Sequence, residues 1–103
     1  DMAKLLEDIY RGRVIDKSVS LKCLDILKRQ KMRDRIPKYL PPDTVVAHKT
    51  GLENGVCHDA GIVFTPAGDF LICVLTRHTD KTARDAKYLI ARIAKDAYDY
   101  EVR

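Results

Sequence analysis

The chain has 103 residues, which is enough for one small domain, and 46% of them are hydrophobic, so a core can form. Its 19 basic and 15 acidic residues give a net charge of +4, but the two signs are interleaved. The densest basic run, Lys28 to Arg35, contains no aromatic residue, so we interpret it as a solvated helix end rather than a nucleic-acid site. No apolar run of about 18 residues occurs, which excludes a membrane span.

Two amphipathic helices are predicted at the start of the chain. The first covers residues 1–11 and has no Ser, Thr, Asp or Asn ahead of it as a cap, which suggests a chain cut from a longer one. The second is capped by Asp16 or Ser18 and runs to about Gln30. Its apolar side is broad, and we expect a small sheet to leave part of it uncovered; the side consists of Val19, Cys23, Leu24, Ile26 and Leu27.

After a proline-rich connection over 34–43, strands are predicted at about 44–50, 57–65 and 69–76, joined by tight glycine-containing turns that favour antiparallel hairpins. The last strand is apolar from Phe70 to Leu75, which predicts burial on both faces, although helices readily cover only one. A closing helix is expected over 80–100, capped by Asp80 or Thr79. Its apolar stripe, predicted to be core, is Ala86, Leu89, Ile90, Ile93, Ala94, Ala97 and Tyr100. The fold class is therefore α+β.

The three cysteines, Cys23, Cys57 and Cys73, form no C-x-x-C pair, so the sequence signals neither a disulfide framework nor a zinc site, and no cofactor is expected. Cys57, His58 and Asp59 have the residue types of a nucleophile, a base and an acid. On a strand, however, His58 faces away from both neighbours, so we interpret them as ordinary strand residues.

The exit of the first strand carries the best candidate site, Lys49-Thr50-Gly51. Alternation along a strand directs Lys49 and Gly51 to one face and Thr50 to the other. A cation beside a hydroxyl suits a carboxylate, and a glycine lets a ligand lie against the backbone. The alternative is a strand end followed by a turn.

The residues around this candidate site carry a family resemblance. His48-Lys49-Thr50-Gly51, then His58-Asp59-Ala60-Gly61-Ile62-Val63, then Val74-Leu75-Thr76 resemble the C-terminal part of the penicillin-recognising serine hydrolases, most closely class A β-lactamases. The resemblance implies a partial β-lactamase/transpeptidase-like fold, with residues 1–103 forming one partial domain. It also implies an intact protein that hydrolyses a β-lactam through an acyl-enzyme.

The resemblance also implies roles for individual residues. Lys49 is expected to attract the substrate carboxylate and Thr50 to hydrogen-bond to it, while Gly51 leaves room for the acyl group. The backbone N–H of Leu52 is expected to be one oxyanion-hole donor. Asp59 ranks next, as a carboxylate of the neighbouring strand behind the substrate-binding residues or as a structural partner of His48 or Lys49.

The family's nucleophile is missing from this sequence. Ser18 and Ser20 are the only serines, neither has lysine three positions later, and no Ser-Asp-Asn occurs, so the isolated chain is expected to be inactive. The loop after Gly51 also lacks the Arg or Ser/Thr that many class A enzymes use there as carboxylate anchors. Two alternatives therefore stay open. The chain is a fragment of a D,D-peptidase or penicillin-binding protein, or it is a non-catalytic assembly module.

The expected partners follow from this interpretation. They are a β-lactam or a D-Ala-D-Ala-like peptide in the intact protein, and either the missing N-terminal segment or a self-associated copy. The family implies a location in the bacterial periplasm or at the cell surface, and no metal is expected.

Overall fold

The computed structural model describes all residues, 1–103, as three helices and three strands. The helices are α1 (Met2–Tyr10), α2 (Lys17–Lys28) and α3 (Arg84–Val102). The strands are β1 (Val45–Glu53), β2 (Val56–Phe64) and β3 (Phe70–Arg77). The α+β prediction is therefore confirmed, and none of the helices is long and apolar enough to cross a bilayer.

The sheet is an antiparallel meander in the order β1-β2-β3, as the glycine-containing turns predicted. Asn54 and Gly55 alone connect β1 to β2, and Gly55 has φ +83°, a conformation that glycine adopts without strain. β1 continues three residues beyond the predicted end at residue 50. Gly51 and Leu52 therefore belong to the strand and not to a turn.

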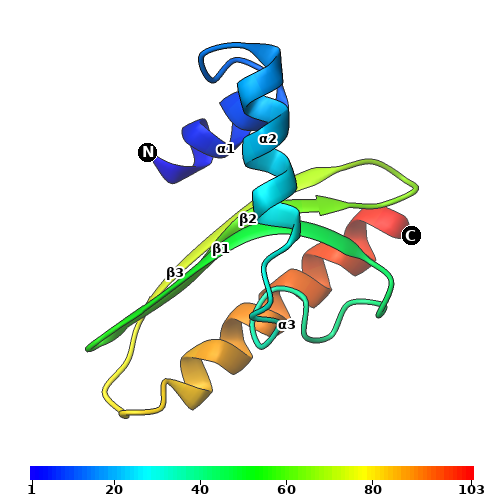
Figure 1. Ribbon diagram of the computed structural model, residues 1–103. Coiled ribbons are helices and arrows are strands. Elements are labelled where there is room, and N and C mark those ends of the chain that lie inside the picture. The colour runs from blue at the N-terminus through cyan, green and yellow to red at the C-terminus, as the bar shows by residue number, and fades with distance from the viewer.

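Two separate helical layers cover the two faces of this sheet (Figure 1). α1 and α2 pack on one face, where Leu6 and Leu24 meet Ala47 and Ile62. α3 packs on the other. The residues of that second core are Ile36, Leu40, Val46, Cys57, Val63, Ala83, Ala86, Ile90 and Ala94. The expectation that helices would readily cover only one face is corrected, because the N-terminal pair and the closing helix pack on opposite sides.

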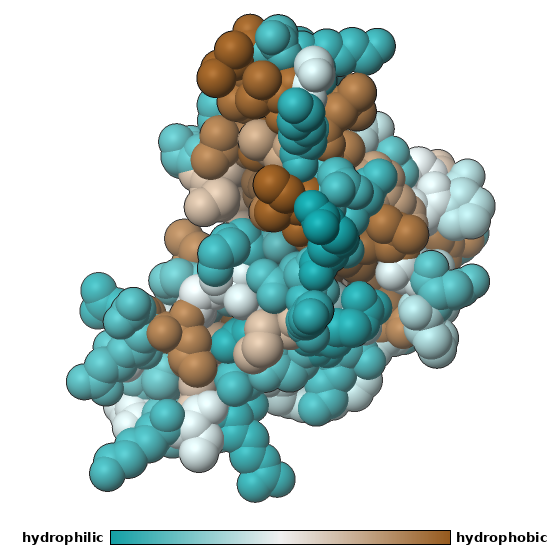
Figure 2. Space-filling view, viewed as in Figure 1, coloured by the Kyte–Doolittle hydropathy of each residue, from teal (hydrophilic) through white to brown (hydrophobic).

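The prediction that β3 is buried on both faces is wrong. β3 is an edge strand that pairs with β2 alone, and Leu71 and Leu75 remain 38% and 68% exposed. Apolar surface also gathers over the N-terminal helices (Figure 2). There Leu21 and Ile26 of α2 are 56% and 61% exposed, which confirms that this small sheet leaves part of the α2 stripe uncovered.

The helix starts differ from prediction. α3 begins at Arg84 and not at residue 80, because Ala83 adopts a left-handed conformation with φ +56°. Asp80 still caps the helix from a distance, since its carboxylate accepts the Arg84 N–H at 2.9 Å. α1 was expected to lack a cap, yet Asp1 caps it by accepting the Lys4 N–H at 2.8 Å.

The predicted α3 stripe is only partly core. Ala86, Ile90 and Ala94 are buried against the sheet, whereas Leu89, Ile93 and Tyr100 keep exposed fractions of 49%, 39% and 65%. The exposed members follow one flank of the helix, because a side chain every third or fourth residue lies on the same side.

Candidate functional site

The second half of β1 carries the candidate residues on alternating faces, as strand geometry predicted. Thr50 lies opposite Asp59, on the face that packs against α3. Lys49 lies opposite Ala60 and Gly51 opposite His58, both on the other face. Lys49 is exposed, and its ammonium donates a hydrogen bond to the Thr50 carbonyl. It forms no ion pair with a carboxylate of the chain, so it can pair with one from a ligand.

β1 is an edge strand, so a ligand can approach its backbone from the side. Because a two-residue loop follows Glu53, Glu53 and Val56 close the hairpin as a hydrogen-bonded pair. Hydrogen-bonded and free positions alternate along an antiparallel ladder, which directs the Leu52 N–H toward the open edge. A ligand along this edge can meet Lys49 from one face and Thr50 from the other.

Gly51 leaves room for one methyl group beside this edge. A methyl group built on Gly51 comes no closer than 3.5 Å to any atom outside its chain neighbours, and that atom is Cδ2 of His58. The imidazole of His58 therefore borders the space next to Gly51, on the same face as Lys49. Its sequence pattern predicted an ordinary strand residue, and only the cross-strand register reveals the position of His58 beside Gly51.

Asp59 is completely buried and is the partner of His48. Its carboxylate lies 2.9 Å from Nδ1 of His48 and accepts the backbone N–H of Ile36 at 3.0 Å. Asp59 therefore joins β1, β2 and the loop that precedes β1, directly behind Thr50. Of the alternatives left open by the sequence, the structure places Asp59 against His48 and not against Lys49.

Arg35 is the residue that sequence reasoning missed. It was counted with the solvated basic run, but it is only 1% exposed. Its Nε donates to Sγ of Cys57 at 3.2 Å and its Nη1 donates to Asp34 at 3.0 Å. A buried guanidinium keeps its charge, so a fixed positive charge lies under β2 near Cys57, on the Thr50 face. The adjacent apolar residue Ile36, which is also completely buried, was one signal of this position in the sequence.

No nucleophile joins these residues. Ser20 is buried on α2, where its hydroxyl accepts the Val14 N–H and donates to the Val14 carbonyl. Ser18 is exposed on the same helix, and Cys57 is buried against Arg35. His58 lies on the opposite face from Cys57, as alternation predicted. The three cysteines are free, and no group of three His, Cys, Asp or Glu side chains is arranged to hold a metal.

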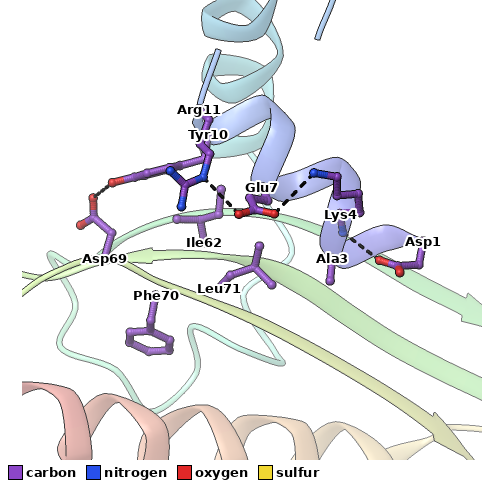
Figure 3. Close-up of a pocket in the computed structure, with 10 residues that line it drawn as sticks. All are labelled: Asp1, Ala3, Lys4, Glu7, Tyr10, Arg11, Ile62, Asp69, Phe70 and Leu71. Atoms are coloured by element: carbon purple, nitrogen blue, oxygen red, sulfur yellow. Dashed lines mark hydrogen bonds and ion pairs between the residues drawn. The ribbon is translucent and has the colours of Figure 1, made fainter. Parts of the chain in front are cut away.

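A hollow of about 510 Å³ lies elsewhere, between α1 and the start of β3 (Figure 3). Ile62 and Leu71 form its floor and α1 its roof. None of the candidate residues on β1 lines this hollow, so the hollow and the candidate site lie at different places on the molecule.

The chain resembles known proteins over nearly its whole length. The sequence pattern of the beta-lactamase enzyme family matches residues 1–101. The chain belongs to this family. It is similar to beta-lactamase VEB-1 of Pseudomonas aeruginosa, with 31% identity over 96% of this chain and 36% of that protein.

The fold agrees with solved structures of the family. The TLA-3 extended-spectrum beta-lactamase superposes with a TM-score of 0.89 at 28% identity, over 99% of this chain and 40% of that one. PBP-A superposes with a TM-score of 0.79 at 24% identity, which shows the fold alone, over 96% of this chain and 38% of that one. This family member therefore spans 36–40% of the length of these relatives, and the predicted partial fold is confirmed.

Proposed function

We propose that this chain is the substrate-binding portion of a serine hydrolase that opens β-lactam rings. The observation that supports it is the arrangement at the open edge of β1, where Lys49, Thr50 and the Leu52 N–H are all accessible to one ligand. In that arrangement the Lys49 ammonium attracts the substrate carboxylate and the Thr50 hydroxyl donates a hydrogen bond to it. The Leu52 N–H donates to the lactam carbonyl oxygen, where negative charge develops.

The chemical step needs a hydroxyl from outside these 103 residues. That hydroxyl attacks the carbonyl carbon, the C–N bond of the lactam breaks, and the nitrogen takes up a proton. Water then attacks the resulting ester and releases the hydroxyl. Within this chain, Asp59 and His48 fix β1 to β2 behind the substrate, so their role is structural support. Arg35 adds a buried positive charge on the side where Thr50 points.

Binding without turnover is the expected behaviour of the isolated chain. We expect no nitrocefin hydrolysis, and we expect penicillin G to shift the NMR amide resonances of Lys49, Thr50 and Leu52. Lys49→Ala is expected to weaken binding at least tenfold. Lys22→Ala, an exposed lysine on α2, is the matched control and is expected to leave binding unchanged. Hydrolysis by the 103-residue chain, or shifts that Lys49→Ala does not alter, would contradict the proposal.

A D,D-peptidase fragment is the second candidate, favoured by the fold shared with PBP-A. A peptide ending in D-Ala-D-Ala carries a carboxylate, which the same Lys49 and Thr50 can bind. Titration with this peptide and with penicillin G, each read at the Lys49 and Leu52 amides, separates the two candidates by their relative affinity.

A completing partner and an exported location are further parts of the proposal. The nucleophile is supplied by another segment carrying Ser-x-x-Lys, and native mass spectrometry of the protein recovered from its source tests for that polypeptide. Periplasmic fractionation tests the location.

A further inference from the structure

The carboxylate of Asp34 bridges two cations that come from different parts of the fold. Its Oδ1 lies 3.0 Å from Nη1 of Arg35, and its Oδ2 lies 3.3 Å from Nζ of Lys87 on α3. The side chains of Lys87 and Asp34 are partly buried, with exposed fractions of 25% and 37%. The loop before β1, which carries Asp34, lies beside the first half of α3 (Figure 1). Ion pairs therefore link α3 to a charge in the interior.

The interior charge, Arg35, is fixed at both ends on the face of the sheet to which Thr50 belongs. Its Nε donates to Sγ of Cys57, and Asp59 accepts the N–H of the next residue, Ile36. Cys57 lies diagonally across the ladder from Thr50, because Thr50 pairs with residue 59. Diagonal neighbours in an antiparallel pair are about 7–8 Å apart. The charge of Arg35 is therefore close enough to act on an anion held by Thr50.

One buried cation does not balance the carboxylates around it. Asp34 pairs with the Arg35 guanidinium, and Asp59 holds the backbone directly beside it. With its partner His48 counted as neutral, Asp59 adds a second negative charge, so negative charge exceeds positive charge in this group. Lys87 brings the second positive charge and balances the group.

The contacts identify Lys87, and not its neighbours, as the balancing cation. Lys38 and Arg84 line the same surface hollow as Asp34, but neither forms an ion pair with it. Because Lys87 is three-quarters buried, water screens its charge less than it screens a fully exposed lysine.

We propose that Lys87 is a positioning residue for carboxylate binding at the edge of β1. By pairing with Asp34, it leaves the charge of Arg35 free to act at Thr50. Without Lys87, Arg35 alone balances the Asp34 carboxylate, and less positive charge acts on the ligand. This inference rests on the proposed function, because it assigns control of ligand affinity to a side chain that acts through Asp34 and Arg35. Every contact that carries it lies within these 103 residues.

Removal and restoration of charge balance test the inference. Penicillin G binding is measured at low salt from the NMR amide shifts of Lys49 and Leu52. Lys87→Met keeps the length of the side chain but removes its charge, and it is expected to weaken binding by about threefold or more. Lys87→Arg is expected to retain the affinity. Adding Asp34→Asn to Lys87→Met removes the unbalanced carboxylate and is expected to restore binding.

Two controls separate this effect from a general loss of structure. Lys95 also pairs with an aspartate on α3, Asp99 at 2.7 Å, but has no link to Arg35, so Lys95→Met is expected to leave binding unchanged. The methyl ester of penicillin G carries no carboxylate. Its binding is expected not to respond to Lys87→Met, whereas structural damage would weaken the binding of both ligands.

The Nε–H of Arg35 tests the same arrangement without a ligand. In the free chain, its NMR resonance is expected to shift in Lys87→Met, to recover in the double variant, and to stay in place in Lys95→Met. If penicillin G does not bind the wild-type chain, the proposed function fails, and this resonance alone decides whether Lys87 controls Arg35.

Three results would overturn the inference. The first is penicillin G affinity that Lys87→Met leaves unchanged. The second is equal weakening of penicillin G and its methyl ester, which would make the role of Lys87 structural. The third is an Arg35 resonance that is the same in the wild-type chain and in Lys87→Met.

Discussion

Nδ1 of His48 lies 2.9 Å from Oδ1 of Asp59, and both side chains are completely buried. Asp59 also accepts the Ile36 N–H, so its carboxylate serves two donors from different parts of the chain. A buried polar group left without its partner costs about 1–3 kcal/mol. We therefore expect Asp59→Ala to lower the free energy of unfolding by about 2–6 kcal/mol, measured by urea denaturation.

The exposed pair of Asp25 and Arg29 provides the control for this measurement, since it lies on the surface of α2 at 3.3 Å. Asp25→Ala is expected to cost less than about 1 kcal/mol, because water screens exposed ion pairs. Equal losses in the two variants would show that the buried pair does not hold β1 to β2.

The glycines of β1 and β2 are expected to respond differently to a methyl group. A Cβ on Gly61 falls 2.5 Å from Cβ of His48 and 2.6 Å from the Ala47 carbonyl, whereas one on Gly51 meets nothing closer than 3.5 Å. Gly61→Ala is expected to destabilise the protein by about 1–3 kcal/mol or more through overpacking. Gly51→Ala is expected to leave the melting temperature nearly unchanged. A thermal melt that ranks them in the reverse order contradicts the packing around His48.

Asp80 makes the start of α3 sensitive to acid. The Arg84 N–H, and after it the Thr82 hydroxyl, hold the pKa of this carboxyl below its ordinary value. The contribution of Asp80 to stability is therefore present above the unfolded pKa of about 3.9 and is lost as the pH falls through the lower folded pKa.

Melting temperatures between pH 7 and pH 2 test this dependence. Asp80→Ala is expected to melt below wild type at pH 7, and the difference is expected to close below about pH 3. Asp43, an exposed aspartate ahead of β1, is the control, and Asp43→Ala is expected to show no such convergence. A difference in melting temperature between wild type and Asp80→Ala that stays constant down to pH 2 would contradict this role of Asp80.

Tyr10 ties α1 to the turn between β2 and β3. Its hydroxyl donates to Asp69 at 2.8 Å, and this hydrogen bond, together with the negative charge of Asp69, raises the pKa of Tyr10. Its contribution to stability is present below the unfolded pKa of about 10 and is lost as the pH rises through the higher folded pKa.

An absorbance titration near 295 nm measures this pKa among the five tyrosines. One tyrosine is expected to ionise later than an ordinary phenol. That late step is expected to disappear in Tyr10→Phe and to move to lower pH in Asp69→Ala. A late step that survives Tyr10→Phe belongs to another tyrosine.

The sequence predicted the strands and their faces well, because the two-residue period of a strand depends only on neighbours along the chain. Opposite orientations of Cys57 and His58 followed from that period alone. Burial depended on distant segments and was harder to predict. The buried position of Arg35 arises from Cys57, 22 residues away, and the exposure of Leu75 arises from the absence of a neighbour for β3.

The candidate site also contains residues that the local sequence predicted and residues that depend on distant segments. Lys49, Thr50, Gly51 and Leu52 were identified from a local motif, and their roles remain a proposal. The neighbouring groups that define their surroundings, His58 beside Gly51 and Arg35 beneath β2, required the register and the packing of the loop before β1.

The separation of the helical layers has a consequence for how the molecule opens. α3 contacts neither α1 nor α2, so the two layers are connected through the sheet and through the loop between α2 and β1, whose Ile36 and Leu40 pack in the α3 layer. Each sheet connection is a short hairpin, and the strands can pair before either layer is in place. Amide hydrogens of α1 and of α3 can therefore exchange with solvent in independent events, each of which leaves the strands protected.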